Sequence, residues 1–207
     1  MEEKKYAPIQ WLWGLFYFHL AGTLLSALVL AATALSFSLG SWFTWAERAV
    51  SLGIAVCLYL LPGNYRYAGM VKALGLLCGL IGLVFHPVLL ALGVHLDPAG
   101  YSLAYTLLSV VSQVLALIAM SLEYITHAAT VPGEKTRWYG LLACSLAVSV
   151  ATHVVADLLQ PLLNTVPMEM FLKFSSVWNP TVRALGLGVS VAYLLLLRRL
   201  IRHQRAE

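Results

Sequence analysis

Six long apolar runs, separated by short polar breaks, constrain this chain more than any other feature. Each run holds roughly the 20 residues that an α-helix needs to cross the hydrocarbon core of a bilayer. The runs cover residues 11–37, 44–62, 70–94, 101–127, 138–163 and 179–198. Their apolar residues are continuous and do not alternate with polar ones, as the strands of an outer-membrane barrel would. The pattern predicts an all-α, polytopic membrane protein built as a six-transmembrane-helix bundle.

The breaks between the runs carry turn-forming residues. Pro, Gly and Asn gather in LPGNYRYAG at 61–69, and similar clusters occur at 95–101 and 130–138. None of the breaks is long enough to hold a soluble domain. We therefore expect residues 1–207 to form a single membrane domain.

The longest break, 164–180, contains a segment of its own. In VPMEMFLKFSSVW at 166–178 the apolar residues can share one helical face, while Glu169 and Lys173 lie four residues apart on another. This pattern predicts a short outer interfacial helix. Whether that helix acts as a lid or as an ordinary connector is left open.

The composition agrees with a bilayer as the main surroundings. The chain is 60% hydrophobic and 11% charged, whereas a soluble domain has about 25% charged residues. Residues 1–10 precede the first run without a small-residue cleavage site, so we expect that run to be a retained helix. The three cysteines lie inside apolar runs, without the spacing of a disulfide framework or a zinc finger.

The positive charges set the expected orientation. Lysine and arginine gather on the cytoplasmic side of membrane proteins. One side of the six-span arrangement holds Lys4, Lys5, Arg66, Lys72, Lys135, Arg137, Arg198, Arg199, Arg202 and Arg205. The other side holds Arg48, Lys173 and Arg183. The distribution predicts that both termini are cytoplasmic, that the protein is a multi-pass protein of the plasma (inner) membrane, and that the basic C-terminus contacts anionic lipid and not nucleic acid.

Ionisable residues collect in the outer half of the predicted spans. Charges in a bilayer are costly, so such residues are functional candidates. His153 and Asp157 lie four residues apart on one helix face, and His86 lies at nearly the same depth on another span. The full set of candidate ligand-binding residues is Glu47, Arg48, His86, His153, Asp157, Gln160 and Arg183. Two interpretations remain open: one shared outward-facing polar cavity, or separate interface positions and helix-packing bonds.

The inner half holds fewer polar residues. Glu123 and His127 lie four apart at the end of the fourth run, and we interpret them as a helix end that is solvated or at headgroup level. His19 is isolated in the first run, where a lone histidine is typical of a hydrogen bond between helices.

The sequence contains no motif that identifies an enzyme or a cofactor. The phosphate-binding loop, the dinucleotide fingerprint, the HExxH zinc motif and the GxSxG elbow are all missing. His86 and His153 are at a matched depth that would suit the axial ligands of haem, but nothing else marks a haem protein. The sequence therefore leaves open whether the protein is an enzyme and whether it holds a cofactor.

Three functions stay open. The first is a small membrane protein that binds a small solute, an ion or a lipid headgroup in the outward-facing cavity, as a transporter or as its substrate-binding membrane subunit. In that case Arg48 and Arg183 would attract an anionic group, and His153 with Asp157 would exchange protons or orient the substrate.

The second function is a membrane-embedded, metal-dependent hydrolase that acts on a lipid-like substrate, with His86, His153 and Asp157 as the candidate metal ligands. The third is a non-catalytic membrane partner or assembly subunit. Besides the lipid bilayer, a homo-oligomer or a larger membrane complex is left open as a partner.

Overall fold

The computed structural model describes residues 9–35, 37, 39–60, 68–93, 98–163 and 167–206. These residues form six α-helices, one short 3₁₀ helix and no strand, so the all-α prediction is confirmed for this part of the chain. The elements are α1 (Ile9–Ala34), α2 (Ser41–Tyr59), α3 (Ala68–Gly93), α4 (Pro98–Thr130), η1 (Pro132–Glu134), α5 (Lys135–Leu163) and α6 (Met168–Ala206).

The sixth helix differs from the prediction. A separate interfacial helix at 166–178 was expected, but α6 runs without interruption from Met168 to Ala206 and includes Pro180. A proline removes one backbone donor and usually kinks or ends a helix. The helix continues past it here, and the Thr181 hydroxyl donates a hydrogen bond to the Val177 carbonyl oxygen at 2.7 Å.

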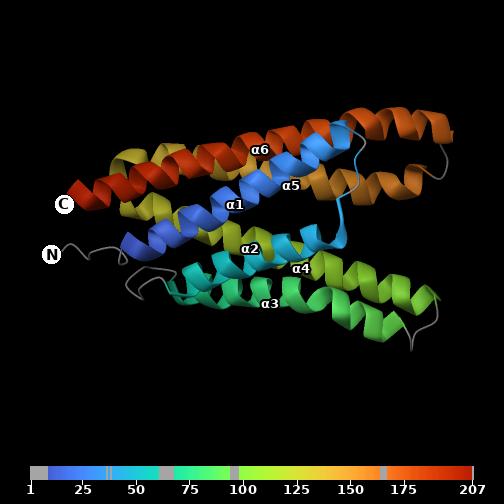
Figure 1. The fold of residues 1–207 in the computed structure, drawn as a ribbon, viewed down its shortest axis with the longest axis horizontal. Coiled ribbons are helices and arrows are strands. Elements are labelled where there is room, and N and C mark those ends of the chain that lie inside the picture. The colour runs from blue at the N-terminus through green and yellow to red at the C-terminus, as the bar shows by residue number, and fades with distance from the viewer. Residues whose placement is uncertain are drawn as a thin grey trace.

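The helices pack as a ring. Each helix packs against its neighbours in the chain, and α1 closes the ring by packing against α6. The helices run lengthwise beside one another, and both chain termini lie at the same end (Figure 1). We call the end of the ring where α1 begins and α6 ends the termini end. The other end of the ring, where α5 ends and α6 begins, is called the opposite end.

The densest packing lies at the termini end. All six helices contribute to one cluster of buried side chains there. Its members are Leu12, Leu15, Cys57, Leu58, Val71, Tyr124, Ala128, Val131, Trp138, Leu141, Tyr193, Leu196, Leu197, Leu200 and Ile201. Most lie towards the beginning of α1, α3 and α5 or towards the end of α2, α4 and α6. Close-packed side chains without voids exclude water, so this cluster closes the ring at the termini end.

The outside of the ring is rich in apolar side chains. Leu24 is 62% exposed and Leu195 is 57% exposed, and soluble monomers rarely expose large apolar patches. Two described segments, Gln10–Ala34 and Leu172–Gln204, are long and apolar enough to cross a membrane, and most of their residues are not buried. These two helices support a membrane location. The six-span bundle goes beyond them and stays a prediction.

Candidate functional site

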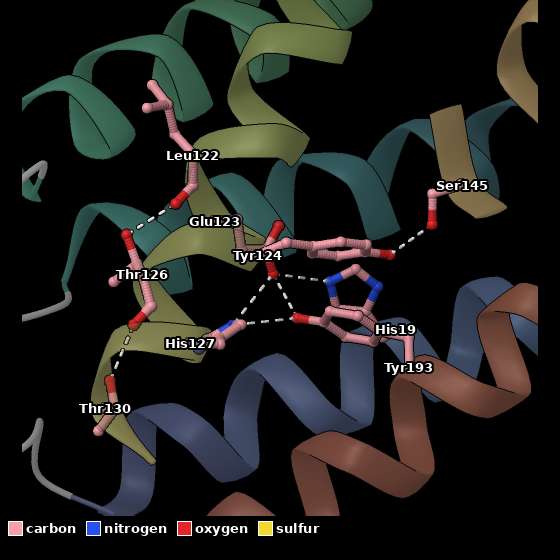
Figure 2. A network of polar contacts seen from close by, with 9 residues as sticks. All are labelled: His19, Leu122, Glu123, Tyr124, Thr126, His127, Thr130, Ser145 and Tyr193. Atoms are coloured by element: carbon pink, nitrogen blue, oxygen red, sulfur yellow. Dashed lines mark hydrogen bonds and ion pairs between the residues drawn. The ribbon is translucent and has the colours of Figure 1, made fainter. Parts of the chain in front are cut away.

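Glu123 is the centre of a buried polar cluster in the ring. Its side chain is only 6% exposed, and the Tyr193 hydroxyl donates a hydrogen bond to its Oε1 atom. The same oxygen lies 3.5 Å from His127 Nε2 and 3.7 Å from His19 Nε2. Figure 2 shows these side chains meeting at one carboxylate. We call His19, Glu123, His127 and Tyr193 the Glu123 cluster.

The Glu123 cluster joins helices that are not neighbours in the ring. Glu123 and His127 come from α4, one helical turn apart, which places both on one face. His19 comes from α1 and Tyr193 from α6, and neither helix is among the principal packing partners of α4. The cluster therefore connects opposite sides of the ring through side chains alone.

Aromatic rings enclose the Glu123 cluster. The Tyr124 ring stacks on the Tyr193 ring with centroids 5.3 Å apart, and the Trp138 ring lies 4.9 Å from the His127 ring. The Ser145 hydroxyl donates a hydrogen bond to the Tyr124 hydroxyl at 3.2 Å. His127 is fully buried and Trp138 is nearly so. The cluster is therefore closed on the side of the termini end.

A central cavity lies on the other side of the Glu123 cluster. It has a volume of about 480 Å³, and residues of all six helices line it. The polar side chains along it are His19, Ser51, Cys78, Glu123, Tyr124, Ser145, Ser149, Ser190 and Tyr193. Glu123 is the one formally charged side chain among its described lining residues.

Two smaller cavities adjoin the central one. The first, of about 250 Å³, is lined by His19 and Glu47, among others. The second, of about 370 Å³, is lined by Trp178 and Arg183 near the opposite end of α6. Ser190 lines all three cavities. Polar space therefore extends from the opposite end of the ring towards Glu123.

Two of the predicted site residues line the cavities that adjoin the central one. Glu47 and Arg183 each line an adjoining cavity, and Arg183 is close enough for its charge to act on the Glu47 carboxylate. Arg48 is placed differently, because its guanidinium lies over the Trp45 ring, 5.0 Å from the ring centroid. A ligand-binding role for these residues stays a prediction.

The other predicted site residues cannot be placed in the same way. The backbone of His86 lies in α3, and that of His153, Asp157 and Gln160 lies in α5. Their side chains are outside the described residues. Among the side chains that are described, no group of three or more His, Cys, Asp or Glu could hold a metal ion. The metal and haem predictions at His86 and His153 therefore stay untested.

The interpretation of Glu123 and His127 as a solvated helix end was wrong. Glu123 is 5% exposed and His127 is 0% exposed. The reason is tertiary: α5 folds back after η1 and places Trp138 against His127, while Tyr193 reaches Glu123 from α6. The four-residue spacing of Glu123 and His127, at a depth similar to that of His19, was the available signal.

Comparison with protein-family models, with curated proteins and with solved structures finds no match to this chain.

Proposed function

We propose that this protein crosses the plasma membrane six times and binds a small solute in its central cavity. It acts as a carrier, or as the substrate-binding membrane subunit of a larger transporter. A ring with an apolar outside and a polar centre suits this role, because lipid contacts the outside while water and solute enter the centre.

One observation carries the proposal: a cavity lined by all six helices has a buried carboxylate at its base. A bundle with a purely structural role would fill its centre with close-packed apolar side chains. Ionisable groups inside membrane segments instead mark pathways for substrates, ions or protons. The side-chain cluster that closes the termini end leaves the opposite end as the entrance.

The charge distribution gives the direction of this entrance. Both termini lie at one end of the ring (Figure 1), as an even number of crossings requires. That end also carries the basic residues of the α6 C-terminus, including Arg198 and Arg199, and such residues favour the cytoplasm. The cavity then opens to the outer side.

The native cysteines provide a test of the proposed function. Cys78 lines the central cavity, Cys144 is exposed on the outside of the ring, and Cys57 is buried. Three single-cysteine variants, with the other two cysteines replaced by alanine, are treated from the outer side with a membrane-impermeant methanethiosulfonate. Cys78 should react because water reaches it. Cys144 should not react because the thiolate, which is the reactive form, does not form in lipid.

The reactivity pattern can also contradict the proposal. If Cys144 reacts as fast as Cys78, the outside of the ring faces water and the membrane carrier is excluded. If Cys78 is as inert as Cys57, no open cavity exists. A carrier should expose Cys78 from the inner side during part of its cycle, whereas a binding subunit should expose it only from the outer side.

A further inference from the structure

We propose that the base of the central cavity binds a small organic ammonium ion in exchange for a proton on the Glu123 cluster. The inference deepens the proposed function and rests on it for one condition, namely that the cavity is open to water. The proposed ligand is an amine with an apolar body, a class of ligand that the sequence alone does not indicate.

The charge at the base of the central cavity favours a cation. Glu123 is the one formally charged group among the described residues that line the central cavity, and it is almost fully buried. In a cavity of low dielectric constant a carboxylate attracts a cation and repels an anion more strongly than it does in water. Arg183 lines only the adjoining cavity nearer the opposite end, so no described arginine or lysine competes with the cation at the base.

The walls of the cavity match the two parts of an organic amine. An ammonium group carries N–H donors and no acceptor, and the lining supplies acceptor oxygens from Ser51, Ser145, Ser149, Ser190 and Tyr124. The aromatic rings of Tyr124 and Tyr193, which line the same cavity, can also attract a cation.

The hydrocarbon part of the amine has apolar walls to contact. Ile54, Met120 and Val189 line the same cavity. A metal ion fits less well, because the described residues contain no group of three or more ligating side chains suited to one. The lining therefore favours an organic cation over an inorganic one.

His19 supplies a second, independent observation. Its Nε2 atom is buried and forms no hydrogen bond of normal length; the nearest acceptor, Glu123 Oε1, is 3.7 Å away, which allows an ion pair when the imidazole is protonated. The His19 side chain lines both the central cavity and one adjoining cavity. A buried polar atom without a partner is costly. An ammonium N–H, or a proton on the imidazole, would satisfy it.

Proton exchange follows from the groups that face Glu123. His19 faces it from α1, His127 and Tyr124 from α4, and Tyr193 from α6. From α5, Trp138 and Ser145 pack around the cluster, and neither side chain is an acid or a base near neutral pH. The remaining two helices contribute thiols: Cys57 of α2 lies in the buried cluster at the termini end, and Cys78 of α3 lines the central cavity.

With both imidazoles neutral and Glu123 ionised, the cluster carries one negative charge. One added proton makes it neutral and removes the attraction for a cation. An ammonium ion that binds to the protonated cluster must therefore displace that proton, which leaves to the solvent.

The experiment uses the full-length protein in detergent and three probes of similar shape. Phenethylammonium is the cation, 2-phenylethanol is the neutral analogue and 3-phenylpropanoate is the anion. Calorimetric titration at about pH 8 should show binding of the cation at least about tenfold tighter than that of either analogue. At about pH 5.5 this affinity should fall about tenfold or more, because histidine changes charge in this range. In weakly buffered solution near neutral pH, binding should release protons.

Substitutions assign the effect to Glu123. Glu123→Gln keeps the shape and removes the charge, so phenethylammonium and 2-phenylethanol should bind equally. Glu169→Gln is the matched control, because Glu169 is 81% exposed and pairs with Lys173 outside the cavities; it should keep the preference for the cation. If Glu123→Gln does not fold, His19→Gln should still reduce the change in affinity between the two pH values.

The inference is overturned if wild-type protein binds the three probes equally, or if folded Glu123→Gln keeps the preference for the cation. Its failure can be told from failure of the proposed function. Labelling of Cys78 without any preference for the cation removes the ammonium site and leaves the carrier. A Glu123-dependent preference, together with rapid labelling of Cys144, leaves the ammonium site and removes the membrane carrier.

Discussion

At the scale of single residues, Tyr193 is the contact that joins α6 to the Glu123 cluster. Its side chain is 2% exposed, its hydroxyl donates to Glu123 Oε1, and its ring lies against those of His19, Tyr124, His127 and Trp138. A buried carboxylate that loses a donor keeps the cost of its desolvation. Tyr193 therefore stabilises the ionised form of Glu123 as well as the packing of the helices.

Tyr193→Phe tests this role, because it removes the hydroxyl and keeps the ring. We expect the free energy of unfolding in detergent to fall by about 1–2 kcal/mol, within the range of single hydrogen bonds in proteins and membrane helices. Tyr139→Phe is the control, because Tyr139 is 49% exposed, and it should change stability little. Equal effects in both variants would show that the hydrogen bond to Glu123 contributes nothing.

At the scale of the elements, α2 and α3 approach each other closely at a glycine. A Cβ atom added at Gly79 would lie 2.7 Å from the Cβ of Ala55, which is closer than real Cβ atoms come. Small residues allow such close contact between helix backbones in membrane proteins. Neither atom belongs to a flexible side chain, so the two helices would have to move apart.

Gly79→Ala should therefore destabilise the protein by about 1–3 kcal/mol, the usual cost of overpacking. Gly188 provides the comparison, because it lies inside α6 and a Cβ there would meet nothing within 4 Å. Gly188→Ala should be neutral or stabilising by up to about 1 kcal/mol through helix propensity. Thermal unfolding of both variants in detergent measures the difference. A stable Gly79→Ala protein would contradict the close approach.

At the scale of the whole molecule, the ring predicts which surfaces lie on which side of the membrane. Lys135 begins α5 at the termini end, and Glu169 lies in the first turn of α6 at the opposite end. In a cysteine-free background, Lys135→Cys should react with an impermeant thiol reagent only from the cytoplasmic side, and Glu169→Cys only from the outer side. Reaction of both positions from one side would exclude the six-span arrangement.

The helices could be predicted from the sequence because hydropathy acts locally. In the hydrocarbon of a bilayer, an apolar run must satisfy its backbone hydrogen bonds internally. A helix does so whatever its neighbours are. The clear difference is at 166–178, where an apolar face opposite the charged pair of Glu169 and Lys173 indicated a separate interfacial helix. The helix continues there, with Lys173 Nζ and Glu169 Oε1 2.8 Å apart on its exposed face.

The sequence predicts the depth of a residue along its helix, but it does not predict the rotation of each helix about its axis. Each residue advances a helix by about 1.5 Å, so Glu47 and Arg183 were expected at a similar level. Which side chains face the centre depends on the order of the helices in the ring, and that order is set by packing between distant segments. The sequence by itself therefore determined helices, apolar character and an expected orientation. Only the tertiary structure placed His19, Glu123 and Tyr193 together, because contacts between α1, α4 and α6 exist only once the ring has closed.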